Sequence, residues 1–158
     1  MQYADSEGEY PAVSPQEKKF IQEATGTFLH YARAVDATML PDLGSIATQQ
    51  ASPTENTTKK VNFFLDYAVS HPDAIITYRA SDMVLAAHSD ASYFSESKAR
   101  SRTGGNIFMS NDNAIQANNG AILTVSQIIK AVMSSDAEAK LGDLFINCRE
   151  AIPARHAL

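Results

Sequence analysis

Cysteine pairs, long apolar runs and an excess of positive charge are all missing from this sequence, and each absence argues against a class of protein. The single cysteine, Cys148, has no second cysteine to pair with, so an internal disulfide is excluded. This favours a reducing compartment, cytoplasmic or nuclear, over secretion. No apolar run approaches the roughly 18 residues that a membrane span needs, and the acidic, polar residues 1–10 are untypical of a signal peptide. We therefore expect an intracellular protein with no membrane partner.

The balance of charge argues against nucleic acid as a partner, but only weakly. The formal net charge is −5, whereas proteins that bind nucleic acid usually carry a basic surface. The charge is unevenly distributed, because several acidic residues lie within residues 1–10 and a basic cluster lies in the middle of the chain. This cluster consists of Lys98, Arg100 and Arg102. The overall charge therefore does not exclude contact with phosphates.

The first half of the chain has the pattern of a small helical unit that follows a flexible tail, residues 1–13. Ser14-Pro15-Gln16-Glu17 predicts a helix start, because Ser14 can cap the helix, proline suits its first position and Glu17 can close a capping box. Apolar residues then recur at helical spacing, at Phe20, Ile21, Ala24, Phe28, Ala32 and Val35. We expect a first helix that ends near Asp36 and a short second helix from about Asp42 to Gln49.

A third helix is predicted by a second start signal and a clear stop. Ser52-Pro53-Thr54-Glu55 repeats the first start signal, and His71-Pro72 ends the helix, because proline lacks a backbone donor and restrains the residue before it. Residues 14–71 therefore predict a helical segment.

The second half, residues 72–158, has a different pattern, rich in β-forming residues. We expect strands over Ala74–Arg79, Met83–Ala91, Gly105–Ser110 and Ala121–Val125. A helix should follow from about Asp136, with one apolar face directed into the core. That face consists of Leu141, Leu144, Phe145, Cys148 and Ile152. The whole chain is therefore predicted to be α+β, with helices first, then an antiparallel meander, then one helix.

Six stretches of the chain, taken in order, form a specific series. They read GTFLHYARAVDATML, ATQQASPTENT, LDYAVSHPDAI, HSDASYFSESKARSRTGG, NNGAILTVSQIIKAVMSS and GDLFINCREAIPARHAL. The series resembles the polyprotein of copia-type LTR retrotransposons, from about Ser14 to Leu158. The resemblance implies that residues 14–71 are like the thumb and connection region of the reverse transcriptase. Residues 72–158 then look like the N-terminal half of a ribonuclease H domain, whose strands form an antiparallel meander followed by a helix.

The resemblance also implies a catalytic activity, and it implies that part of the reverse transcriptase is missing from this sequence. Family members cleave the RNA strand of RNA–DNA hybrids with magnesium, because two ions roughly 3.5–4 Å apart can activate water and stabilise the leaving oxygen. The polymerase palm with its paired aspartates is not in this sequence. We therefore expect a truncated piece that cannot synthesise DNA by itself.

Two positions carry the resemblance to the nuclease site. Asp90, in HSDASY, matches the family's first metal-binding aspartate, although an aspartate at a strand end is common in any protein. Lys140 stands where the family has its metal-binding glutamate. A lysine there should repel a magnesium ion, and the family's later aspartates would lie beyond Leu158. We therefore expect a vestigial metal position at Asp90, no bound magnesium and no catalysis.

Neighbouring carboxylates are poor replacements for the missing glutamate. Glu138 lies two residues from Lys140, about 200° round the helix, and it can form a capping box with Ser135. Asp136 and Asp143 share the face of Lys140 but lie about one turn, near 5 Å, along the helix axis. Rescue of the metal site would need substantial rearrangement.

Three hypotheses follow. The first is an inactive remnant of a reverse transcriptase and ribonuclease H region, and the second is an active nuclease that uses Asp90 with a carboxylate of the last helix. The third is a non-enzymatic α+β module in which Lys98, Arg100 and Arg102, on one side of an extended backbone, bind an RNA–DNA hybrid or a partner chain. The ordinary alternative for this cluster is a solvated hairpin rim. Truncation should also leave a strand edge open to self-association.

Overall fold

The computed structural model describes residues 10–112 and 117–158, which form two compact units within 10–75 and 76–158. The expected boundary at residues 71/72 lies a few residues before this division. Of the expected tail, residues 1–9 lie outside the described residues. Residues 10–13 contact the start of the third helix: Ala12 forms a β-bridge with Thr54, and the amide of Glu55 donates to the carbonyl of Pro11 over 3.1 Å.

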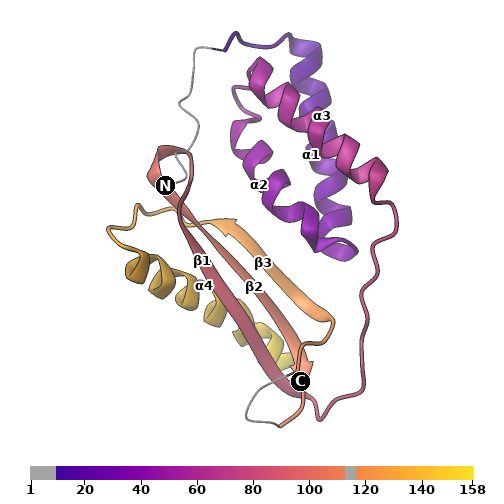
Figure 1. Ribbon diagram of the computed structural model, residues 1–158, viewed down its shortest axis with the longest axis vertical. Helices are drawn as coiled ribbons and strands as arrows, with labels where there is room; N and C mark the ends of the chain where they lie inside the picture. The colour runs from indigo at the N-terminus through magenta and orange to yellow at the C-terminus, as the bar shows by residue number, and fades with distance from the viewer. Residues whose placement is uncertain (1–9, 113–116) are drawn as a thin grey trace. The chain divides into compact units, whose positions relative to one another are not determined.

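The first unit is helical (Figure 1). Its elements are α1 (Pro15–Ala34), η1 (Ala37–Met39), α2 (Leu40–Gln49) and α3 (Glu55–Ser70). The predicted capping box begins α1: the Ser14 hydroxyl accepts from the amide of Glu17 over 3.2 Å, and the Glu17 carboxylate accepts from the amide of Ser14 over 2.9 Å. The start of α3 differs from the prediction, because Thr54 caps it and pairs with Thr57. The helix ends at Ser70, before Pro72 as expected.

The helical unit has an apolar core formed by all three helices. Its buried members are Ile21, Ala32, Met39, Leu40, Leu43, Ile46, Val61 and Phe64. Phe28 packs edge-on against Phe64, with ring centroids 5.1 Å apart. Phe20 was predicted on the same face but is 47% exposed, because the buried stripe of α1 is centred on its neighbour Ile21. Val35, also predicted on this face, is 36% exposed, because it lies just past the end of α1. The helical spacing therefore predicted the middle of the face correctly and was wrong at both ends.

Over its described residues, the second unit contains an antiparallel sheet and one α-helix (Figure 1). Its elements are β1 (Val84–Glu96), η2 (Ser97–Ala99), β2 (Arg100–Ser110), β3 (Ala121–Ile128) and α4 (Asp136–Ala157). The strand order is β1-β2-β3. The strand expected over Ala74–Arg79 is not formed; that segment has no regular structure, and Tyr78 instead donates its hydroxyl to the carbonyl of Ala121 over 3.1 Å. The architecture is α+β, as predicted.

The register of the sheet determines which side chains share a face. Ala91 pairs with Thr103, and Asp90 pairs with Gly104. Ala91 packs against Ala139 of α4 in a small apolar cluster, so Ala91 and Thr103 lie on the helix-side face of the sheet. Side chains alternate along a strand. Asp90 and Arg102 therefore lie on the opposite face.

The helix α4 faces the sheet with the side that the sequence did not predict. Its buried residues are Ala139, Asp143 and Asn147, which recur every fourth position. Leu141, Leu144, Phe145 and Ile152 are 67%, 54%, 68% and 54% exposed, and Cys148 is exposed. The prediction that these residues form the core was wrong. Small and hydrogen-bonding side chains bring the helix close to β2, whereas the bulky apolar stripe does not contact the sheet.

Candidate functional site

Asp90 is exposed and lies on the sheet face that points away from α4. It belongs to the regular part of β1, opposite Gly104 of β2. Its neighbour Ala91 is buried against α4, so the alternation of the strand directs the Asp90 carboxylate to the other side. The predicted strand position of Asp90 is confirmed, but its carboxylate does not face the helix that should supply the second ligand.

Lys140 lies on the solvent side of α4. Its ammonium forms an ion pair with Asp136 one turn earlier, at 3.2 Å, and both side chains are more than half exposed. Ala139, the preceding residue, is fully buried against the sheet, so position 140 is directed away from the helix–sheet contact. An exposed pair of this kind contributes little stability. Lys140 is therefore a surface residue.

The structure does not bring Asp90 and position 140 together, because the sheet lies between the Asp90 carboxylate and α4. Among residues 10–112 and 117–158, no group of three histidine, cysteine, aspartate or glutamate side chains is placed to hold a metal ion. Magnesium requires a set of hard oxygen ligands at nearly octahedral positions. Asp90 alone does not supply such a set, so the described residues do not fit the magnesium site that the resemblance implies.

Asp143 is the carboxylate that does face the sheet, and one of its oxygens, Oδ1, accepts two hydrogen bonds there. It is 3% exposed and accepts hydrogen bonds from the hydroxyl of Thr103 and from the side-chain amide of Asn147, the latter over 2.9 Å. Asn147 also donates to Thr103 over 3.1 Å. These three residues link α4 to β2. The spacing of Asp143 and Asn147 by one helical turn was the signal in the sequence that could have indicated this polar contact.

Glu138 is also committed to a structural role. Its carboxylate accepts from the amide and the hydroxyl of Ser134, each over 2.6 Å, and these bonds hold the pKa of Glu138 below its usual value. The Ser135 hydroxyl accepts from the amide of Glu138 over 3.1 Å. The predicted cap at Ser135 is confirmed, although the returning bond goes to Ser134. Glu138 therefore stabilises the start of α4.

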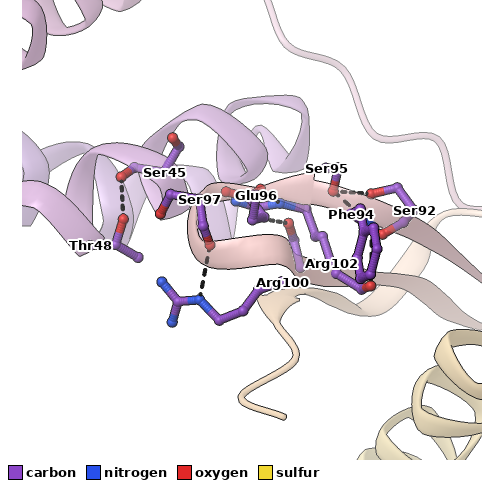
Figure 2. Close-up of polar contacts among 11 residues, drawn as sticks. Ser45, Thr48, Ser92, Phe94, Ser95, Glu96, Ser97, Arg100 and Arg102 are labelled. Carbon is purple, nitrogen blue, oxygen red and sulfur yellow. Dashed lines mark hydrogen bonds and ion pairs between the residues drawn. The ribbon is translucent and has the colours of Figure 1, made fainter. Parts of the chain in front are cut away.

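The basic cluster at the tip of the β1–β2 hairpin is not extended throughout (Figure 2). Lys98 lies in η2 with a φ of 60°, a left-handed conformation, and is exposed. Arg100 donates its Nε to the carbonyl of Ser97 over 3.3 Å. Because the turn separates Lys98 from β2, the expected alternation holds only for Arg100 and Arg102. The prediction that all three lie along one extended strand was wrong.

Arg102 is largely neutralised within the sheet. Its Nε lies 2.6 Å from a carboxylate oxygen of Glu96, and the two side chains are 12% and 13% exposed (Figure 2). Its Nη1 donates to the hydroxyl of Ser126 over 3.3 Å. A guanidinium that is paired and mostly buried presents little charge to a ligand. The tip therefore presents Lys98 and, in part, Arg100 to solvent.

Comparisons with known proteins identify no relative of this chain. No family model, curated protein or solved structure matches the chain. None of the helices in the described ranges is both long enough and apolar enough to cross a membrane. The function is therefore proposed from the residues and geometry of the chain itself.

Proposed function

We propose that this chain is a non-catalytic α+β module related to the ribonuclease H region of copia-type polyproteins. The observation that carries the proposal is the separation of Asp90 from position 140, on different sides of the sheet. The kinship is supported by the ordered series of sequence stretches. It is also supported by the order of elements, an antiparallel meander followed by a helix.

The chemistry explains why this arrangement does not support hydrolysis. Metal-dependent cleavage of a phosphodiester needs carboxylates close enough to share two divalent ions. Within the described residues Asp90 belongs to no group of three possible metal ligands. Asp143 is hydrogen-bonded inside the helix–sheet contact, and Lys140 is a cation. The role that remains is binding or structural.

The test is an assay of a labelled RNA–DNA hybrid with magnesium, using the wild-type chain and the variants Asp90→Asn and Lys140→Glu. We expect no cleavage above buffer for any of the three. The Lys140→Glu variant should stay inactive, because a carboxylate at position 140 would still be directed away from Asp90. Cleavage by the wild-type chain that Asp90→Asn abolishes would refute the proposal.

A second candidate function is weak binding of an RNA–DNA hybrid through the hairpin tip. It is favoured by the exposure of Lys98 in the turn, next to the half-buried Arg100. Two phosphate contacts predict that log affinity falls with log salt with a slope of about −2, by the rule for duplexes. Fluorescence anisotropy at several salt concentrations measures this slope.

The hairpin variant Lys98→Glu/Arg100→Glu should lose most of that affinity. The variant Lys19→Glu/Lys59→Glu changes the net charge equally but lies on α1 and α3, and it should bind like the wild type. Equal losses in the two variants would show that the net charge, and not the hairpin, attracts the hybrid.

A further inference from the structure

The exposed side of α4 carries an apolar stripe with the spacing of a helix-pairing seam. Leu141, Phe145, Cys148 and Ile152 follow one another at intervals of four, three and four residues. This alternation is the a/d pattern by which two helices pack side by side. All four are exposed, and Leu144 extends the stripe on one flank. Apolar side chains gathered on one helix face mark a surface that binds another polypeptide.

The stripe is complementary to itself when two copies of α4 run antiparallel. A two-fold axis that passes between Ile146 and Asn147 places Leu141 opposite Ile152 of the other copy. The same axis places Phe145 opposite Cys148, so the apolar residues meet one another. In this register each a position lies opposite a d position of the other copy, as it does in an antiparallel pair of helices.

The charges on α4 match the same register. Glu138 is exposed near the start of the helix, and Arg155 is exposed near its end. The axis that aligns the apolar residues also places Glu138 of each copy opposite Arg155 of the other. Ser134 bonds only Oε2 of Glu138, so Oε1 of each copy can pair with Arg155 of the other and two ion pairs form by symmetry. Antiparallel helices also place each helix start, with its partial positive charge, beside a helix end. A parallel pair would instead place like charges together.

We propose that α4 is the interface of a homodimer in which two copies of this chain pair antiparallel through this stripe. The partner is a second copy because one register satisfies the apolar stripe and the charged ends of the same helix together. Such a two-fold interface is isologous, with the same surface contributed by both chains. This surface is distinct from the sheet edge at which self-association was expected from the sequence. The inference does not depend on the chain being inactive.

Cross-linking tests the interface, because Cys148 is the single cysteine of the chain and lies in the stripe. In the proposed register the two Cys148 positions are offset by about 4.5 Å along the axes, from three residues at 1.5 Å each. Helices in contact lie about 8–10 Å apart. A short bismaleimide should therefore produce a covalent dimer. Cys148→Ser should abolish the product, and Phe145→Asp should reduce it at least tenfold while the far-ultraviolet circular dichroism is unchanged.

A charge swap tests the register. Sedimentation equilibrium should show that Arg155→Glu weakens dimerisation about tenfold, because it places two pairs of like charges together. Adding Glu138→Arg should return the dissociation constant to within about threefold of the wild type, although this change also removes the Glu138–Ser134 bonds. Lys19→Glu, on α1, should have no effect. A chain that stays monomeric at high concentration overturns the proposal, and so does a dimer that the swap fails to restore or that Phe145→Asp does not weaken.

Discussion

The helical unit and the sheet unit use the same amino acids in opposite ways. In the helical unit the apolar stripe of each helix is the buried stripe, and Phe64 and Val61 of α3 are 3% and 1% exposed. In the sheet unit the apolar stripe of α4 is exposed, and the helix packs through Ala139, Asp143 and Asn147. The first unit is therefore held together by an apolar core. The second is held by the β-ladder, a buried polar contact and a small apolar cluster around Ala139.

The difference teaches that hydrophobic periodicity identifies a helix but not the face that it buries. On α4 the small residue Ala139 packs beside Ala91 of β1, and the polar residues Asp143 and Asn147 meet β2 around Thr103 and Gly105. A Cβ added to Gly105 would overlap the side-chain amide of Asn147, so the amide fills the space that a larger residue at position 105 would need. Hydrogen bonds to Thr103 then favour polar side chains on α4. The apolar face is left for another contact.

The largest expected effect on stability comes from a substitution in the apolar core of the helical unit. Phe64→Ala should lower the free energy of unfolding by about 3–5 kcal/mol, because it removes a buried aromatic ring and leaves a cavity. Phe63→Ala, one residue earlier on α3, removes a ring that is 75% exposed. This variant should change the free energy of unfolding by less than about 0.5 kcal/mol. Urea unfolding followed by circular dichroism measures both. Similar values for the two variants would contradict an apolar core centred on Phe64.

The next effect concerns the close contact of the sheet unit. Gly105→Ala should destabilise it by about 1–3 kcal/mol, the usual cost of overpacking. Gly104→Ala is the matched control, because its Cβ would meet only the carbonyl oxygen of Asp90 at an ordinary 3.6 Å. Unfolding in urea should show little change for the control.

A double variant isolates the cause of the Gly105 effect. If the added methyl group collides with Asn147, Gly105→Ala/Asn147→Ala should be no less stable than Asn147→Ala alone, a non-additive result expected of residues in contact. Additive losses would mean that α4 and β2 are not in close contact at this point.

A smaller effect tests where α3 begins. Thr54→Ala should cost about 1 kcal/mol, because Thr54 is the N-cap residue of α3 and forms a capping box with Thr57. Ser52→Ala should be nearly neutral, although Ser52 has the same position in the sequence signal as Ser14 of α1. Thermal unfolding of the two variants compares them. A larger loss of stability for Ser52→Ala than for Thr54→Ala would instead support the helix start at Ser52 that the sequence predicted.

The smallest effect is a pH dependence of stability that the two units share. Hydrogen bonds from Ser14 and Ser134 hold the pKa values of Glu17 and Glu138 below the usual value. Because these carboxylates have lower pKa values when folded, the stability they contribute is present above the unfolded pKa and is lost as the pH falls through the folded pKa. Both helix starts should therefore loosen in acid, one in each unit. Side-chain carboxyl signals in an NMR pH titration would reveal an unshifted pKa if either bond were absent.

Local signals in the sequence predicted much of the fold. The capping box at Ser14, the end of α3 before Pro72, the cap at Ser135 and the β3 start at Ala121 all depend on residues within one turn or one strand. The segment Ala74–Arg79 has strand-forming residues but no partner strand, so its composition misled the prediction. Composition predicts a strand only where a neighbouring strand can satisfy its hydrogen bonds.

Only the tertiary structure decided the candidate site. The sequence by itself determined that Asp90 lies on a strand and that position 140, a lysine, lies on a helix. The face on which each is presented depends on the Ala91–Thr103 register and on contacts between residues some forty positions apart, such as Thr103 with Asn147. The neutralisation of Arg102 by Glu96 likewise depends on the turn between β1 and β2. Periodicity describes one element at a time, whereas burial is a property of two surfaces in contact.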